Sequence, residues 1–453
     1  MKILLINPPF SKYGPFSVRI PLGVTYLASS IKDKHEVKIL DLQLETVKKF
    51  KPVTNIKKTL NSFKPDVVCI CHVIAATYPY LKILAKQIKE FNKEIITITG
   101  GYFPTVNPKR TLKDNKEFID IIVKGEGEEI LPILLEKISK KERIDNIINV
   151  RTVNSLDKHP IPARDLLDIK EYKKYSYAED YSLGSIITSR GCPYNCSWCA
   201  NKEFLRYRER SMDNIIEEIK LMKDKYKINK FKIEDESFTA NRKRVVEFCK
   251  KIKPLKVNWF IKTRADLIDD KLIKTMYNAG MRKILIGFED LNLDNVKKMK
   301  GFSNKNIDYD HIIKEIHKYN GLKLVGTFLI GHENIKPKET INSLKWTYKN
   351  FRKGDYIFMS HYLPPKIDDL DFKKFKSIDS NFLHWTLCRP VVENESWSIK
   401  DYKKVNNLYR NIIRKKMFLP YIPDWNNDLY GHITNLIKMI YRKFRNKWIS
   451  LMR

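Results

Sequence analysis

The run TSRGCPYNCSWCA at residues 188–200 places Cys192, Cys196 and Cys199 on one short loop. The spacing Cys-x3-Cys-x2-Cys supplies three thiolates, which suits a 4Fe-4S cluster with one iron left without a protein ligand. A structural zinc site is the alternative, because Cys-x2-Cys pairs commonly bind zinc. A closed zinc site needs a fourth ligand, yet the other cysteines and the nearest histidines are scattered: Cys69, Cys71, Cys249, Cys388, His159 and His311. We therefore expect an iron–sulfur cluster with an open coordination position.

Downstream of this loop, short apolar runs alternate with amphipathic runs. We expect strands at residues 186–188, 230–233, 258–261, 283–287 and 324–331, and helices at 212–226, 242–251 and 271–278. The first helix carries Ile215, Ile216, Ile219 and Met222 on one face, as an amphipathic helix does. Repeated β–α units predict a barrel of parallel strands, whose active residues cluster at the carboxyl ends of the strands.

Upstream of the loop, residues 1–140 alternate in the same way. Apolar, β-branched runs predict strands at residues 3–6, 37–40, 67–71, 95–99 and 119–123, with helices at 22–31, 56–63, 80–91 and 129–138. This alternation predicts an α/β domain with a doubly wound, Rossmann-like parallel sheet. Ligands of such sheets bind beyond the carboxyl ends of the strands, where glycine lets the backbone approach a bulky ligand.

An aromatic residue, Trp198, stands just before the last cysteine, and the loop resembles the cluster loop of the radical S-adenosylmethionine (radical SAM) enzymes. The strand-end runs of the first 140 residues, with Pro21-Leu22-Gly23 opening the first helix, resemble the cobalamin-binding domain that precedes many radical SAM cores. The resemblance spans residues 1–345 and implies a partial (β/α)6 TIM-like barrel behind the Rossmann-like domain. It also implies three cofactors, namely a 4Fe-4S cluster on the three cysteines, S-adenosyl-L-methionine (SAM) on the open iron, and cobalamin.

The strand ends of the expected barrel supply groups that can hold SAM. By the resemblance, the acidic segment with Asp235 and Glu236 holds the amino group of SAM. Arg264 can pair bidentately with the SAM carboxylate, and Glu289 can accept hydrogen bonds from the ribose hydroxyls. The alternatives are a solvated acidic turn and structural ion pairs of Arg264 and Glu289. Two further candidates complete the set, Gly331 beside the adenine and Trp198 beside the cluster, where Trp198 can also be a plain core aromatic.

Cobalamin is expected at the carboxyl edge of the N-terminal sheet. The family's lower-ligand motif, D-x-H-x-x-G, is absent, because His72 has Ile70 and Ala75 at the positions of the aspartate and the glycine. The cobalt therefore has no obvious protein ligand, and a domain that only supports the core or binds substrate is the alternative. The candidate residues at this edge are Pro8, Pro9, His72, Gly100, Gly101, Thr105, Gly125, Glu126, Gly127 and Glu128.

The length of 453 residues exceeds one ordinary core and predicts several domains. We expect a cobalamin-binding domain over residues 1–140, a linker over 141–183, the radical SAM core over 184–345 and a mainly helical C-terminal region over 346–453 that shapes the substrate pocket. The basic stretch 433–453 has apolar residues at helical spacing. Such a helix can lie on a membrane surface, although packing on its own barrel is the more ordinary outcome.

The net charge of +33 permits a nucleic-acid substrate, but lysines spread evenly over helices are ordinarily solvated surface. No apolar stretch reaches the ~20 residues that span a bilayer, and no secretory signal peptide precedes the first strand. Seven cysteines in so long a chain are no disulfide framework, so we expect a reducing, cytoplasmic location. The expected partners are a small-molecule substrate and an external electron donor of the flavodoxin or ferredoxin type.

The resemblance implies reductive cleavage of SAM and abstraction of hydrogen from an unactivated carbon, followed by cobalamin-dependent methyl transfer. Three alternatives stay open. The same parts serve cyclisation or rearrangement. An RNA- or protein-modifying radical SAM enzyme without corrinoid is the second, although the second cysteine set usual in thiolation enzymes is absent. A non-catalytic zinc-binding scaffold is the third.

Overall fold

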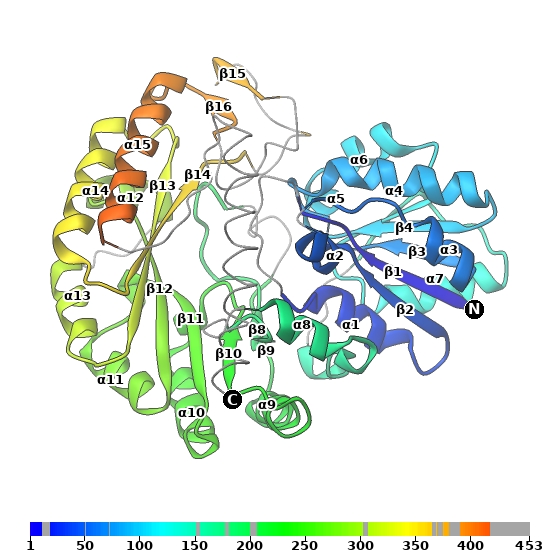
Figure 1. Ribbon diagram of the computed structural model, residues 1–453, viewed down its shortest axis with the longest axis horizontal. Helices are drawn as coiled ribbons and strands as arrows, with labels where there is room; N and C mark the ends of the chain where they lie inside the picture. The colour runs from blue at the N-terminus through cyan, green and yellow to red at the C-terminus, as the bar shows by residue number, and fades with distance from the viewer. Residues whose placement is uncertain are drawn as a thin grey trace, which may run out of the picture.

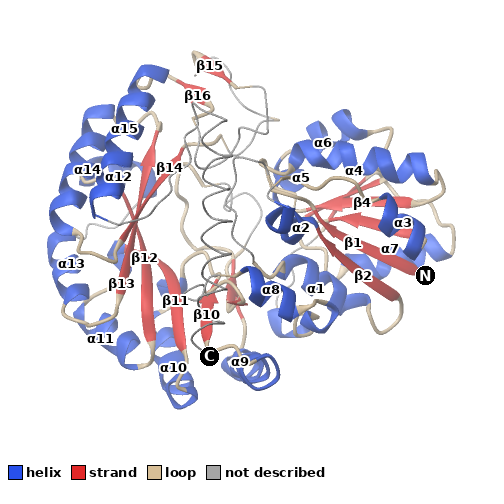
Figure 2. Ribbon diagram, viewed as in Figure 1, coloured by secondary structure: helices blue, strands red, loops and turns tan. Residues whose placement is uncertain are grey.

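The computed structural model describes residues 1–10, 19–49, 51–71, 73–150, 155–176, 181–199, 206–301, 307–364, 368, 375–379 and 390–416. These residues form two α/β domains that lie side by side, with the N-terminal domain on the right and a half-open barrel on the left in Figure 1. Strands and helices alternate through both domains, as Figure 2 shows. The predicted fold class is confirmed.

The N-terminal domain is a six-stranded parallel sheet in the order β2-β1-β3-β4-β5-β6. Its strands are β1 (Lys2–Asn7), β2 (Glu36–Asp41), β3 (Val67–Ile70), β4 (Ile96–Gly100), β5 (Ile121–Lys124) and β6 (Ile147–Asn149). Its helices are α1 (Leu22–Ile31), α2 (Leu42–Lys49), α3 (Lys57–Phe63), α4 (Tyr78–Phe91), α5 (Tyr102–Val106), α6 (Pro108–Asn115) and α7 (Ile130–Ser139). β6 extends this sheet past the predicted boundary at residue 140.

Helices cover both faces of the N-terminal sheet, which explains why its strands β1, β3 and β5 are mostly apolar and buried. Along β1, Leu4 and Ile6 pack with residues of α3 and α4, whereas Ile3 and Leu5 pack with residues of α1 and α7. β1 runs from the N-terminus at the outer edge toward the barrel (Figure 1). The carboxyl edge of the sheet, where ligands of such folds bind, therefore faces the second domain.

The barrel is a second six-stranded parallel sheet, in the order β14-β13-β12-β11-β10-β7. Its strands are β7 (Gly184–Ile186), β10 (Lys230–Ile233), β11 (Asn258–Arg264), β12 (Met281–Glu289), β13 (Lys323–Ile330) and β14 (Tyr356–His361). Its helices are α9 (Met212–Tyr226), α10 (Arg242–Ile252), α11 (Asp270–Asn278), α12 (Leu293–Lys300), α13 (Tyr309–His317) and α14 (Pro337–Asn350). β14 carries the barrel past residue 345, the predicted end of the core.

The first barrel strand lies two residues earlier than predicted and ends at Ile186. Beyond it, β8 (Ser189–Arg190) forms an antiparallel pair with β9 (Arg208–Glu209). This pair brackets the cysteine loop. The described part of the C-terminal region adds β15 (Ser377–Ile378), β16 (Val392–Glu393) and α15 (Ile399–Lys416). Residues 433–453 lie outside the described residues, and among the described helices none is long and apolar enough to cross a membrane.

Short elements connect the two domains. They are α8 (Ile169–Tyr175) and the 3-10 helices η1 (Leu156–Lys158) and η2 (Arg164–Leu166), whereas η4 (Phe238–Ala240), η5 (Lys253–Leu255) and η6 (Ala265–Leu267) lie in the barrel. The C-terminal region adds a second connection, because Val391 and Val392 join the apolar cluster of α3 and α4 in the N-terminal domain. The N-terminal domain is thus held from two sides.

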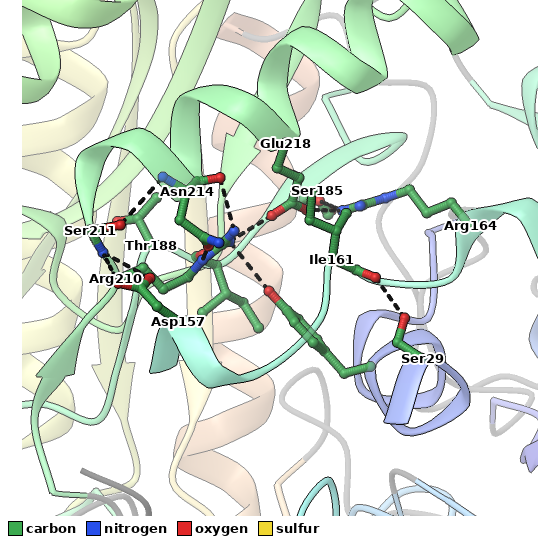
Figure 3. A network of polar contacts seen from close by, with 12 residues as sticks. Ser29, Asp157, Ile161, Arg164, Ser185, Thr188, Arg210, Ser211, Asn214 and Glu218 are labelled. Carbon is green, nitrogen blue, oxygen red and sulfur yellow. Dashed lines mark hydrogen bonds and ion pairs between the residues drawn. The ribbon is translucent and has the colours of Figure 1, made fainter. Parts of the chain in front are cut away.

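A buried ion triad joins the connecting segment to the barrel (Figure 3). The Glu218 carboxylate on α9 is fully buried and lies 2.6 Å from Arg164 of the connection and 2.6 Å from Arg210. The two guanidiniums also donate to the carbonyls of Ser185 and Ile187, at 2.8 and 2.7 Å. A buried carboxylate is stable only when charge and hydrogen bonds compensate its lost hydration, so the triad fixes how the connection docks on the barrel.

Candidate active site

The cysteine loop follows β8 at the carboxyl edge of the barrel. Cys192, Cys196 and Cys199 are all partly exposed. A hydrogen bond from the Cys199 amide to the Cys196 carbonyl, at 3.1 Å, tightens the loop, and the Ser197 amide donates to the Met299 carbonyl at 2.8 Å. Burial raises the pKa of the Cys196 thiol, and the nearby Arg264 opposes that effect. Three thiols on one short loop, with a cation beside them, suit a cluster whose cysteines bind as thiolates.

Asp235 fixes the segment that leads into this loop. Its buried carboxylate accepts hydrogen bonds from the Thr188 amide and the Ser189 hydroxyl, both at 2.7 Å, and from the Thr188 hydroxyl at 2.5 Å. Both carboxylate oxygens are therefore engaged with the protein. The contact of this acidic segment with the SAM amino group stays a prediction. The next residue, Glu236, is exposed, and its charge adds to burial in raising the pKa of the Cys192 thiol.

Arg264 ends β11 and points at the cysteine loop. Asp266 takes two of its donors, Nε at 2.9 Å and Nη2 at 3.2 Å. The guanidinium lies over the Tyr194 ring, 4.1 Å from the ring centroid, and Nη1 lies 3.7 Å from the Cys196 sulfur. Asp266 therefore holds the Nε–Nη2 side of the guanidinium, and the contact of Arg264 with the SAM carboxylate stays a prediction.

Glu289 ends β12 in a left-handed backbone conformation, with φ of 65°. Such a conformation is uncommon outside glycine and clusters at functional sites. The carboxylate lies 3.4 Å from the ammonium of Lys300, which donates to the Gly287 carbonyl at 2.6 Å. Glu289 therefore stands at the predicted strand end, held by an ion pair, and its contact with the SAM ribose stays a prediction.

Gly331 ends β13, also with a positive φ of 86°. A Cβ atom here would lie 2.1 Å from the Tyr402 hydroxyl of α15, so the missing side chain admits α15. The place of Gly331 beside the adenine stays a prediction. The next residue, His332, was missed by the sequence analysis, although it directly follows a strand end. Its Nε2 lies 3.3 Å from the Ser197 hydroxyl, and its ring is nearly perpendicular to that of Trp198, with the ring centroids 6.4 Å apart. Burial lowers the pKa of His332.

The predicted cobalamin residues of the N-terminal domain gather at the carboxyl edge of its sheet. Pro8 and Pro9 follow β1 and are buried. Gly101 has a φ of 122° and Gly125 a φ of 114°, values that favour glycine, and the Gly125 amide donates to the Thr105 hydroxyl at 3.1 Å. A backbone-lined edge of this kind fits a bulky planar ligand. The other candidates on this edge are Gly100 and Gly127, and His72 lies outside the described residues.

Two carboxylates of this edge bind the barrel. Glu126 lies 3.0 Å from Arg190 and 2.8 Å from Arg208, and Glu128 lies 2.6 Å from Arg190. Although burial raises the pKa of Glu126, Arg208 and Arg190 hold it below its usual value. These ion pairs engage both carboxylates, and the contact of Glu126 and Glu128 with cobalamin stays a prediction. Arg190 stands two residues before Cys192, so these ion pairs link the predicted cobalamin edge to the cysteine loop. We call the group of Glu126, Glu128, Arg190 and Arg208 the carboxylate–arginine joint.

Comparisons with known proteins agree with this arrangement. The B12 binding domain family matches residues 17–135 and the Radical SAM superfamily matches residues 186–346. An uncharacterized methyltransferase of Pyrococcus horikoshii is 30% identical over 433 residues, which are 89% of this chain and 90% of the relative. The chain belongs to the B12-binding radical SAM enzymes. The cofactors of this family, a 4Fe-4S cluster, SAM and cobalamin, are as predicted. The zinc scaffold and the enzyme without corrinoid are therefore wrong.

One further sequence relative and one solved structure are similar to this B12-binding radical SAM enzyme. An anaerobic magnesium-protoporphyrin IX monomethyl ester cyclase of Rubrivivax gelatinosus is 27% identical over 485 residues, covering 100% of this chain and 85% of the relative. The solved structure of the radical SAM methyltransferase TsrM of Kitasatospora setae, with tryptophan and a SAM analog bound, gives a TM-score of 0.71 at 14% identity. It covers 98% of this chain and 99% of TsrM, and it shows that the two share the fold.

Proposed function

We propose that this enzyme is a cobalamin-dependent radical SAM methyltransferase that acts on a small molecule. The supporting observation is the carboxylate–arginine joint, in which Glu126 of the predicted cobalamin edge binds Arg190 beside the cysteine loop. The cysteine loop, which would hold the cluster and SAM, and the sheet edge, which would hold cobalamin, are therefore directly joined. When bound, the cluster and SAM supply hydrogen abstraction and cobalamin supplies the methyl group.

The residues of this chain have distinct parts in the proposal. Cys192, Cys196 and Cys199 hold the cluster, and three ligands leave one iron for SAM. Asp235 holds the loop through Thr188 and Ser189 rather than touching SAM. Glu236 and Glu289 are the remaining carboxylates for the SAM amino group and ribose, since Glu236 is exposed near Cys192.

The division of the chain follows from the two sheets. We assign residues 1–150 to the cobalamin-binding domain, 151–183 to the connection, 184–361 to the radical SAM core and 362–453 to the region that shapes the substrate pocket. The ends of the first and third parts are moved to include β6 and β14. The proposal includes a cytoplasmic location. It also includes an electron donor of the flavodoxin or ferredoxin type, because an acidic donor complements the net charge of +33.

Cyclisation is the second candidate, because the relative from Rubrivivax gelatinosus that spans the whole chain is named a cyclase. SAM with a trideuterated methyl group distinguishes the two. The protein is purified without oxygen, reconstituted with iron, sulfide and hydroxocobalamin, reduced and given this SAM. We expect four irons and one cobalamin per chain, with deuterated methyl groups on the bound cobalamin. A loaded enzyme that releases 5′-deoxyadenosine but never labels cobalamin contradicts methyl transfer and favours the cyclase.

A further inference from the structure

The Arg264 guanidinium is held in place from two sides. Asp266, itself buried, binds it through two donors at 2.9 and 3.2 Å, and the Tyr194 ring lies under it at 4.1 Å. Together they orient a third donor, Nη1, at the sulfur of Cys196, 3.7 Å away. Tyr194 belongs to the cysteine loop itself, so the loop carries both the sulfur and the ring that supports the donor.

We propose that Arg264 is a positioning residue that donates to the Cys196 thiolate of the loaded cluster and thereby sets the reduction potential of that cluster. The geometry supports this role, because Asp266 holds the Nε–Nη2 side of the guanidinium and leaves Nη1 directed at Cys196. Hydrogen bonds to cluster sulfurs and the charge around them are among the factors that set such potentials. A donor and a positive charge stabilise the reduced cluster, which is more negative by one electron, and so make its potential less negative.

Asp266 compensates the positive charge of Arg264. Its carboxylate neutralises most of the guanidinium charge, so the effect of Arg264 on the cluster acts mainly through the directed N–H group. Removing the negative charge of Asp266 therefore shifts the potential in the opposite direction from removing Arg264. Substitutions of Arg264 and of Asp266 should therefore shift the reduction potential in opposite directions. If both substitutions only loosened the loop, the two shifts would have the same direction.

The proposal rests on the cluster assignment but not on methyl transfer, so its test does not depend on the substrate. The reconstituted enzyme is titrated with dithionite, which supplies the electron, and the reduced cluster is followed by electron paramagnetic resonance. In Arg264→Met we expect about a tenfold lower ratio of reduced to oxidised cluster at a fixed potential near the midpoint, which is a shift of about 59 mV to more negative values. Arg264→Lys is expected to recover part of the shift, because its ammonium still has N–H donors but lacks the planar fork that Asp266 orients.

A matched control stands on the same barrel. Arg242 forms an ion pair with Asp269 at 2.8 Å, but this pair is exposed, and Arg242 begins α10 rather than ending a strand. Arg242→Met is expected to leave the potential unchanged. Arg264→Met with a normal iron content and an unshifted potential overturns the proposal. If Arg264→Met does not load iron, Asp266→Asn decides: a shift to less negative potential supports the proposal, and an unchanged or more negative potential overturns it.

Discussion

Removing the Glu218 carboxylate is predicted to destabilise the barrel strongly. The side chain is fully buried and holds Arg164 and Arg210, whose side chains are 2% and 4% exposed. Glu218→Ala leaves both guanidiniums buried without their counter-charge, and breaking a buried ion pair from one side costs about 3–5 kcal/mol. Each arginine keeps a carbonyl acceptor, on Ser185 and Ile187, so we expect the lower end, about 3 kcal/mol.

Urea denaturation followed by tryptophan fluorescence measures this loss, because Trp259 is buried in the barrel core. With a urea dependence of about 3 kcal/mol per molar for a large domain, the midpoint falls by about 1 M. Asp213 is the control on the same helix, since its ion pair with Lys251 at 2.6 Å is exposed, and Asp213→Ala should leave the midpoint unchanged. A Glu218→Ala midpoint equal to that of the control refutes the reasoning.

Three further predictions concern the site. Cys196→Ala removes one of three cluster ligands, so iron analysis after anaerobic reconstitution should show less than the four irons per chain of the wild type; an undiminished content would disprove the assignment. Asp235→Asn loses the charge that accepts from Thr188 and Ser189 and should slow cluster loading, whereas wild-type loading would show that this carboxylate does not organise the loop. Arg208 and Arg190 hold the pKa of Glu126 below its ordinary 4.5, so its stabilising effect is fully present above about pH 4.5 and is lost as the pH falls through the lowered value. Glu126→Gln should therefore lose stability at pH 7 and show a weaker acid dependence than the wild type, as measured by urea midpoints from pH 3 to 7.

Much of the fold could be predicted from local patterns. The helix at residues 212–226 and the strand at 230–233 have the predicted bounds, because each pairs a clear apolar face with polar flanks. β6 was missed because it has three residues, none of them buried. β14 was missed because its residues alternate between buried and less buried positions at the edge of the barrel, so its sequence lacks the continuous apolar run of a central parallel strand.

From the sequence alone, the site could be predicted only where residue type and local spacing are enough to indicate the chemistry. Three cysteines at fixed spacing identify a cluster loop from the sequence alone. The partners of Glu126 could not be found in this way, because Arg190 stands 64 residues further along the chain. Only the packing of two domains brings them together. Likewise, the carboxylate of Asp235 looks free in the sequence, and only the fold places Thr188 and Ser189 against it.

The carboxylate–arginine joint also bears on how such enzymes can be recombined. In a chimera that joins another N-terminal domain to this barrel, Arg190 and Arg208 would face a loop without carboxylates. The two guanidiniums would then weaken the contact between the domains or draw water into it. An exchange of the N-terminal domain therefore has to keep Glu126 and Glu128 opposite Arg190 and Arg208.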